Sequence, residues 1–294
     1  AAATSALRAA YSRGPHHVNF YVDRLSRADR QRQDLARQLR DAIEDDALYV
    51  HYQPQARLSD NALSGCEALV RWTGADGRAI SPADFIPIAE QFDLTRALSE
   101  RVIGRVIADL ETAGLTDGSL PRISINLTPD EFSRGDFVEW LRAQLAPMAH
   151  WRIKPQLEIT EYAALRDLDA SIRRIRTLGE DGIDFALDDF GTGYSSLAAL
   201  KDLPVQELKI DRSFIATVNE DERSLAIVKS ITRLADTFGL RVVAEGVETE
   251  AQLRCLRECH CTESQGYYLS PPLDSLGFAT LVRGGSPLGP RQEG

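Results

Sequence analysis

The sequence predicts an α/β fold in which eight strands close into a barrel. From residue 47 onward, short apolar runs of strand length alternate with amphipathic patterns of helical period, which is typical of a parallel sheet. Eight such runs occur, a number that favours closure into a barrel. The chain of 294 residues is long enough for one large domain of about 250 residues with an appendage.

The predicted strands begin after a charged helix and continue almost to the end of the chain. They cover residues 47–58, 65–72, 122–128, 156–160, 183–190, 206–211, 241–247 and 266–270. The first connection is short and has no helical pattern, so the first two strands can be antiparallel. Among the helices, one apolar pattern stops at Gly239, and Thr249 with Gln252 has the spacing of a capping box.

Differences in composition define the predicted domain boundaries. Residues 1–22 contain a short helical pattern, a glycine break and a strand-like run. Residues 23–46 read as a highly charged helix with a narrow apolar stripe, which is typical of a solvated linker helix with one packed edge. We expect the barrel domain over 47–284 and a disordered tail over 285–294.

Composition and charge argue against several classes of function. The formal net charge of −10 argues against binding to DNA or RNA polymers, which requires a basic face. No run approaches the roughly 20 apolar residues of a membrane span, and the N-terminus lacks the apolar core of a signal peptide. Together with four cysteines that do not resemble a secreted disulfide framework, these features predict a cytoplasmic chain with reduced thiols.

The cysteines near the C-terminus raise the alternative of a zinc site. Cys255, Cys259, His260 and Cys261 lie close together in the sequence. Consecutive ligands around a helix end would crowd one tetrahedral ion, and no second ligand pair has the spacing of a zinc finger. We therefore expect these side chains to be packing residues near a helix terminus.

Polar or charged residues recur at or near the carboxyl ends of the predicted strands. They are Glu67, Asn126, Glu158, Glu161, Asp188, Asp189, Lys209, Glu245 and Glu248, while Gln265 is expected to open the last strand. The carboxyl ends of all strands of a barrel converge on one mouth, so these side chains are expected to meet. Two carboxylates about 4 Å apart repel by roughly 4 kcal/mol at an effective dielectric constant of 20, which favours a shared cation.

The chemistry of these side chains favours a hard divalent cation. Carboxylate and amide oxygens suit Mg²⁺ or Mn²⁺ better than zinc. Adjacent Asp188 and Asp189 would point to opposite faces of a regular strand, but a turn into the following GTG can bring both to the mouth. Two-metal sites of this kind hydrolyse phosphate esters. Taken singly, each acid is more often a helix cap or a surface ion-pair partner, but their recurrence at the same strand end favours a metal site.

Nine short motifs occur in order along the chain and together resemble one family. They are YQPQ, EALVRW, FIPIAE, SINLTP, LEITE, LDDFGTGYSSL, LKIDRSF, VVAEGVETEAQ and QGYYLSPPL. From about residue 40 to 282 the chain resembles the EAL domain family, phosphodiesterases of the bacterial second messenger cyclic di-GMP. The resemblance implies a modified TIM barrel of eight strands whose first strand is antiparallel. It also implies hydrolysis of one phosphodiester bond of cyclic di-GMP to linear pGpG by metal-activated water.

By position, the resemblance implies ligands for two ions of Mg²⁺ or Mn²⁺. The implied ligands of one ion are Glu67, Asn126, Glu158 and Asp188. Those of the second ion are Asp188, Asp189 and Glu245. The implied catalytic residues are Lys209, which matches the lysine that contacts the nucleophilic water, Glu245, which matches a general base, and Glu67. Ca²⁺ is expected to inhibit, because its larger and looser coordination fits an octahedral Mg²⁺ site poorly.

The resemblance also implies residues that bind the substrate or support the site. The implied substrate contacts are Gln53, Leu69, Arg71, Asp211 and Gln265. The implied supporting residues are Glu161, Glu248, Gly191 and Gly193. Among them, Glu161 matches the glutamate that anchors the DFGTGYSSL loop.

The N-terminal segment, residues 1–22, indicates that the chain is a piece of a longer signalling protein. Residues 1–22 resemble the end of a GGDEF diguanylate cyclase domain, but no GGDEF signature occurs here, so no synthesis of the messenger is expected. The expected partners are cyclic di-GMP, a second copy in a homodimer, and upstream signalling domains, and other regions of the full-length protein can attach it to a membrane. Two alternatives stay open, a catalytically weak receptor for cyclic di-GMP and a barrel glycosidase with paired carboxylates.

Overall fold

The computed structural model describes residues 23–192, 197–285 and 287–289, and its chain divides into two compact units. Of the described residues, the first unit contains 23–48 and 71–98, and the second contains 49–70 and those from 99 onward. The predicted remnant at 1–22 and the predicted supporting residue Gly193 lie outside the described residues. No helix in the described ranges combines the length and apolar character needed to cross a bilayer.

The first unit is built around the charged helix. Helix α2 (Asp23–Glu44) was expected over 23–46, and its buried stripe includes Ala36, Leu39 and Ile43. It packs against α3 (Pro82–Gln91), whose N-terminus is capped by the Ser81 side chain. The short strand β3 (Ala79–Ile80) pairs antiparallel with the end of β2, a pairing that the sequence pattern did not predict.

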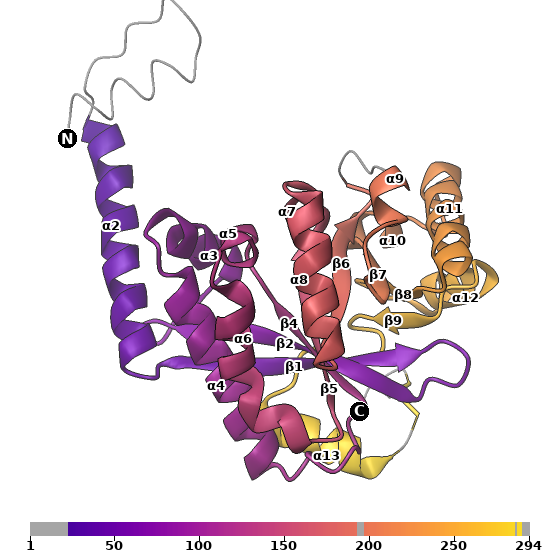
Figure 1. Ribbon diagram of the computed structural model, residues 1–294, viewed down its shortest axis with the longest axis horizontal. Coiled ribbons are helices and arrows are strands. Elements are labelled where there is room, and N and C mark those ends of the chain that lie inside the picture. Colours follow the sequence, from indigo (N-terminus) through magenta and orange to yellow (C-terminus); the bar gives the residue numbers. More distant parts are fainter. Residues whose placement is uncertain (1–22, 193–196, 286, 290–294) are drawn as a thin grey trace, which may run out of the picture. The chain divides into compact units, whose positions relative to one another are not determined.

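The second unit holds a closed barrel of eight strands, as predicted (Figure 1). The strands are β1 (Leu48–Arg57), β2 (Leu63–Thr73), β4 (Arg122–Asn126), β5 (Lys154–Thr160), β6 (Asp184–Phe190), β7 (Glu207–Ile210), β8 (Arg241–Ala244) and β9 (Glu263–Gln265). Their order is β1-β9-β8-β7-β6-β5-β4-β2, and a β1–β2 pairing closes the circle. Strand β1 is antiparallel to β9, whereas the pairs from β2 through β4 to β9 are parallel. The predicted antiparallel first strand is confirmed.

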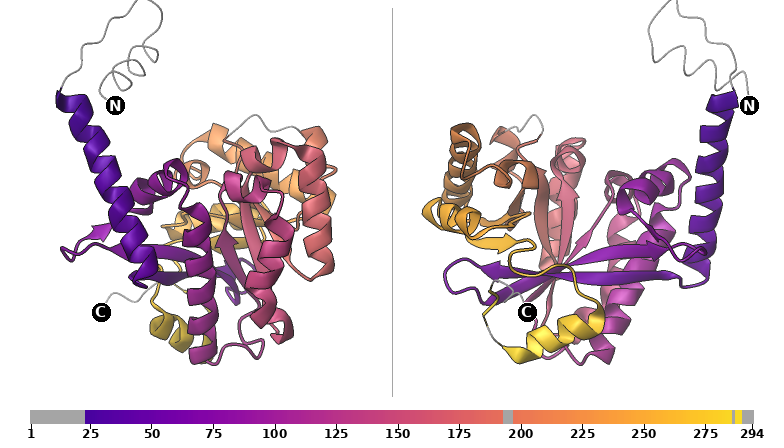
Figure 2. Two further views of the ribbon diagram at one scale, coloured as in Figure 1. Left: turned by 60° about the vertical axis from the view of Figure 1, so that its left-hand side comes forward. Right: turned by 180° about the vertical axis from the view of Figure 1, so that it is seen from behind.

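Helices cover the outside of this barrel. They are α5 (Pro129–Ser133), α6 (Phe137–Leu145), α7 (Glu161–Leu165), α8 (Leu168–Glu180), α9 (Leu197–Leu200), α10 (Arg212–Ile215), α11 (Glu222–Phe238), α12 (Glu250–Glu258) and α13 (Ser275–Gly284), with a 3₁₀ turn at Ala146–His150. Helix α4 (Thr95–Thr112) begins in the first unit and continues in the second. Helix α8 packs along β6, and α11 packs on β7 and β8 (Figures 1 and 2).

Two helix boundaries agree with the sequence pattern because local chemistry fixes them. Helix α11 ends at Gly239, whose φ of 68° is the left-handed conformation that glycine adopts without strain. Helix α12 begins with a capping box, in which Thr249 and Gln252 each accept a backbone N–H of the other residue.

The last strand consists of buried polar residues, and this explains one wrong boundary. The last strand is Glu263–Gln265 and not the predicted 266–270. The residues of this strand are buried but polar. The apolar residues at 266–270 that suggested a strand belong instead to a turn, in which Leu269 donates its N–H to the Gly266 carbonyl. Gln265 therefore ends the strand instead of opening it. A Cβ on Gly266 would lie 2.2 Å from the carbonyl oxygen of Val247, so only glycine permits this backbone approach.

The C-terminal segment is described at residues 285 and 287–289. There Leu288 is buried against Ala56 and Leu269, and its N–H donates to the Asn61 carbonyl. Leu288 falls within the predicted tail over 285–294, of which residues 286 and 290–294 lie outside the described residues, so the disordered tail stays a prediction.

Candidate active site

The parallel strands deliver a single lysine and four carboxylates to one place at their carboxyl ends. Lys209 on β7 has a side chain that is 1 % exposed. Its Nζ lies 2.5 Å from Glu158 on β5 and 2.7 Å from Glu245, which directly follows β8. The same atom lies 3.3 Å from Asp188 on β6 and 3.5 Å from Glu67 on β2. The structure thus gathers residues that are up to 178 positions apart in the sequence.

Amide side chains hold the carboxylate of Glu67 from two sides. Asn126 Nδ2 donates to Glu67 Oε1 at 2.7 Å, and Gln265 Nε2 donates to Glu67 Oε2 at 2.6 Å. Gln265 Nε2 also donates to Gln53 Oε1 at 3.1 Å. Burial would raise the pKa of Glu67, but the Lys209 ammonium and the two amide donors outweigh it and hold that pKa below its usual value. Glu67 is therefore kept ionised.

A backbone irregularity brings both adjacent aspartates to the mouth. The register between β6 and β7 shifts between Leu187 and Phe190, and Asp189 has a φ of 54°. Oxygen atoms of Asp188, Asp189 and Glu245 consequently lie within 4.8 Å of one another. A regular strand would have placed the two aspartates on opposite faces, so the bulge creates this cluster.

The negative charge at the mouth exceeds what one lysine balances. Burial, followed by repulsion from Glu67, raises the pKa of Glu158 well above its usual value. Burial raises the pKa of Glu245 to about 8 against the opposing effect of Lys209, and burial with repulsion from Asp188 raises that of Asp189. For Lys209, burial is outweighed by the surrounding carboxylates, so its pKa is well above the usual value and it stays protonated.

The donor set fits hard divalent cations. Within the described ranges, Glu158 Oε1 is buried and has no hydrogen-bond partner. A buried oxygen without a partner destabilises the fold unless another group, such as a cation, binds it. Around it lie further carboxylate oxygens and the amide of Asn126, the ligand types that Mg²⁺ and Mn²⁺ prefer. Cations at this place would also relieve the repulsion among the acids.

The remaining predicted site residues have varied surroundings. Leu69 is half-buried two residues after Glu67 on β2. Asp211 caps α10 by accepting the Ser213 N–H at 3.0 Å, and Glu161 is the buried first residue of α7. Glu248 is exposed on the loop before α12.

Two further predicted residues lie at boundaries, Gly191 at the end of strand β6 and Arg71 at a boundary between the two units. Gly191 follows β6 with a φ of 98°, and a Cβ there would lie 3.2 Å from the Phe214 ring. Arg71 belongs to the first unit, so its contact with a substrate stays a prediction.

A residue absent from the predicted set lies directly behind the cluster. Gln55 is fully buried on β1, and its Nε2 donates to Gln265 Oε1 at 2.9 Å. The only sequence signal was its spacing, because it follows Gln53 by two residues and so shares a strand face with it.

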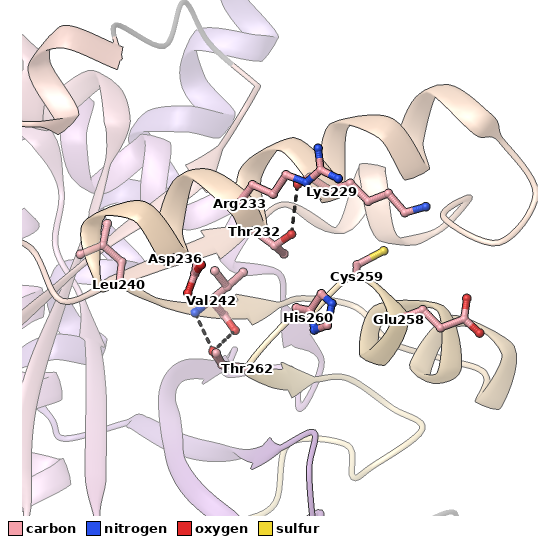
Figure 3. A pocket seen from close by; sticks show the side chains of 10 residues that line it. All are labelled: Lys229, Thr232, Arg233, Asp236, Leu240, Val242, Glu258, Cys259, His260 and Thr262. Carbon is pink, nitrogen blue, oxygen red and sulfur yellow. Dashed lines mark hydrogen bonds between the residues drawn. The ribbon is translucent and has the colours of Figure 1, made fainter.

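The cysteine-rich segment forms a different hollow of about 560 Å³, between α11 and the end of α12 (Figure 3). Its lining includes Cys259 and His260, and it lies by the beginning of β8, whereas the acids lie at the strands' carboxyl ends. Cys255 and Cys261 direct their Sγ atoms to backbone carbonyls. Among the described residues, the acids Asp188, Asp189 and Glu245 are the only group of three potential ligands that converge. The cysteines therefore act as packing residues in this structure.

Comparison with known proteins identifies related chains. The family model described as "EAL domain" matches residues 36–272. The chain is 37 % identical over 270 residues to the cyclic di-GMP phosphodiesterase NbdA of Pseudomonas aeruginosa, covering 92 % of this chain and 34 % of NbdA. It is 37 % identical over 293 residues to a signaling protein of Caulobacter vibrioides, covering 99 % of this chain and 36 % of that one. The chain thus spans about a third of the length of these curated relatives.

Solved structures with the same fold are also similar in sequence. The MucR phosphodiesterase of Pseudomonas aeruginosa, in complex with cyclic di-GMP, has a TM-score of 0.78 and 36 % identity, covering 83 % of this chain and 99 % of that chain. The EAL enzyme Bd1971 in its cGMP-bound form has a TM-score of 0.81 and 30 % identity, covering 87 % and 71 % respectively.

Proposed function

Because the chain belongs to the EAL domain family, we propose that it hydrolyses one phosphodiester bond of cyclic di-GMP and releases linear pGpG. The observation that carries this proposal is the cluster of four carboxylates around buried Lys209, together with the unpartnered Oε1 of Glu158. Relatives and a neighbouring structure described as cyclic di-GMP phosphodiesterases support the choice of substrate.

In this proposal, the residues of the mouth hold two ions of Mg²⁺ or Mn²⁺. Divalent ions, when bound, supply Lewis-acid activation of water and of the phosphate oxygens. One ion is held by Glu67, Asn126, Glu158 and Asp188, and the other by Asp188, Asp189 and Glu245. Glu245, whose carboxylate lies 2.7 Å from Lys209 Nζ at the mouth, is assigned as the general base. Lys209, with its raised pKa, keeps a positive charge beside the reacting phosphate.

Other residues orient the nucleotide and support the mouth. We assign substrate contacts to Gln53, Leu69, Arg71, Asp211 and Gln265, and support to Glu161, Glu248, Gly191 and Gly193. A guanidinium such as that of Arg71 can pair bidentately with phosphate oxygens. Ca²⁺ should compete for the ions' place and inhibit.

The proposal extends to the full-length protein. We infer that the chain acts in the cytoplasm as a homodimer and is controlled by upstream signalling domains. A relative described as a bifunctional diguanylate cyclase and cyclic di-GMP phosphodiesterase, MucR, supports the additional domains, since the match covers 40 % of its length.

The test is turnover of cyclic di-GMP by the purified chain with Mg²⁺ or Mn²⁺, followed by chromatography of the product. We expect pGpG, no turnover in chelator, and recovery when Mg²⁺ is added back. Glu67→Ala should reduce turnover by more than about 100-fold, because it removes a metal ligand. Substitution of residues that only support a ligand typically reduces activity by about 10–100-fold.

The matched control is Asp60→Ala, which removes an exposed carboxylate of the same unit and should leave turnover unchanged. Tight binding of cyclic di-GMP without hydrolysis, in a folded chain with metal present, would instead favour the receptor. Full activity of Glu67→Ala would contradict the ligand assignment.

A further inference from the structure

We propose that Arg122 and Gln55 are positioning residues that orient Glu67 for cation binding through the amide of Gln265. This inference rests on the proposed function, because it concerns the cations that the mouth would hold. None of the four residues is more than 6 % exposed. They are Arg122 on β4, Gln55 on β1, Gln265 on β9 and Glu67 on β2.

The chain of contacts starts at the buried guanidinium of Arg122, near the amino ends of the strands. Arg122 Nη2 lies 2.6 Å from Glu263 Oε2 and 3.2 Å from Glu207 Oε2, so two carboxylates fix the guanidinium. The same nitrogen donates to Gln55 Oε1 at 2.9 Å. A guanidinium has only donors, so the carbonyl oxygen of Gln55 must face it.

That constraint determines the direction of each following hydrogen bond. With its oxygen towards Arg122, Gln55 must turn its NH₂ towards Gln265, where Nε2 donates to Oε1 at 2.9 Å. Gln265 must then turn its own NH₂ towards the mouth. There it donates to Glu67 Oε2 at 2.6 Å. The carboxylate of Glu67 can only accept, so the sequence of donors and acceptors is satisfied at both ends.

We call the hydrogen-bonded series from Arg122 through Gln55 and Gln265 to Glu67 the relay, and the backbone is arranged around it. Gln55 and Gln265 are opposite residues in the antiparallel pairing of β1 with β9, which sets their side chains on one face. Gly65 on β2 leaves room beside them, because a Cβ there would lie 3.1 Å from Gln55 Oε1 and 3.2 Å from the Cβ of Arg122. Any larger residue at this position would press on the contact between Arg122 and Gln55.

The expected consequence is an effect on cation affinity rather than on the chemistry itself. If Gln55 cannot hold Gln265, the amide can rotate and present its oxygen to Glu67, which repels the carboxylate and loosens it. Outer-shell partners of metal ligands typically change metal affinity by about 10–100-fold, and Gln55 acts through one intermediate, so we expect about tenfold.

The test is Gln55→Met, which keeps the side-chain length and removes both polar atoms. Mg²⁺ is titrated calorimetrically into the full chain without nucleotide, and turnover of cyclic di-GMP is then measured over a range of Mg²⁺ concentrations. We expect about tenfold weaker Mg²⁺ affinity and turnover that returns close to the wild-type value at saturating Mg²⁺. A variant that merely loosened the barrel would not be rescued in this way.

Gln156→Met is the matched control. Gln156 is equally buried and bonds to Glu207 and to Arg241. It reaches Arg122 only through Glu207, while Glu263 holds the guanidinium independently at 2.6 Å. It should lose stability similarly and keep its Mg²⁺ affinity. If Gln55→Met does not fold, Gln55→Asn, which stays polar but is too short to span Arg122 and Gln265, replaces it.

The outcomes separate the relay from the proposed function. Unchanged Mg²⁺ affinity in the Gln55 variant, or equal weakening in both variants, would overturn the relay while leaving the function intact. A wild-type chain that binds no Mg²⁺ would overturn the proposed function and the relay with it.

Discussion

Lys209 is the residue on which the charge balance of the mouth depends. It is the only cation in contact with the four carboxylates within the described part of the chain, and it is almost fully buried. A surface lysine would be worth little, whereas removing one partner from a buried ionic group leaves charges without compensation. At this scale the sequence indicated a lysine near a strand end, but its contacts depend on the closed barrel.

Lys209→Met should therefore destabilise the chain in metal-free buffer at neutral pH. We expect the free energy of unfolding to fall by about 3–5 kcal/mol, the usual cost of breaking a buried ion pair. Added Mg²⁺ should recover part of the loss, because a divalent cation replaces the missing positive charge. The measurement is urea-induced unfolding with and without Mg²⁺.

Lys201→Met is the control, because Lys201 is exposed in a turn of the same unit. Its effect should stay within about 0.5 kcal/mol, as for most surface substitutions. Equal effects of the two substitutions would mean that Lys209 does not balance the acids.

Strand β6 decides which acids can meet. Its short apolar run predicted a strand, and the following GTG predicted a turn, but the sequence did not determine that Asp189 adopts a φ of 54°. Strand β9 was placed wrongly for a related reason. The buried residues of β9 are all polar, so Glu263 and Gln265 do not give the apolar pattern by which strands are found. Helix ends were predicted better, because Gly239 and Thr249 act locally.

Gly191→Ala should weaken the end of β6. An alanine would be strained at a φ of 98°, and its Cβ would press on the Phe214 ring at 3.2 Å. We expect the free energy of unfolding to fall by about 1–3 kcal/mol. Gly104→Ala should have the opposite sign, because that glycine lies exposed within α4 with open space around it, and alanine favours helix by about 0.5–1 kcal/mol. Chemical denaturation of both variants checks the signs, and a stabilised Gly191→Ala chain would contradict the strain.

For the molecule as a whole, the alternation of strands and helices predicted a closed barrel, whereas the antiparallel first strand was allowed by the short first connection and implied by the family resemblance. The alternation also predicted that the acids would meet, because a barrel brings the carboxyl ends of its parallel strands to one mouth. The relay from Arg122 to Glu67 could not be predicted in this way, since it joins four strands through side-chain amides whose partners depend on register. The division into two units and the packing of Leu288 likewise follow from tertiary contacts.

The central claim is that the crowded acids at the mouth are balanced by divalent cations, and the most direct measurement is the number of Mn²⁺ ions bound per chain. Electron paramagnetic resonance counts free Mn²⁺ during titration of the metal-free protein. We expect two bound ions per chain, as in two-metal hydrolytic sites, and loss of at least one in Glu67→Ala. Absence of bound Mn²⁺ in the wild-type chain, or the same number of ions in Glu67→Ala, would contradict the account.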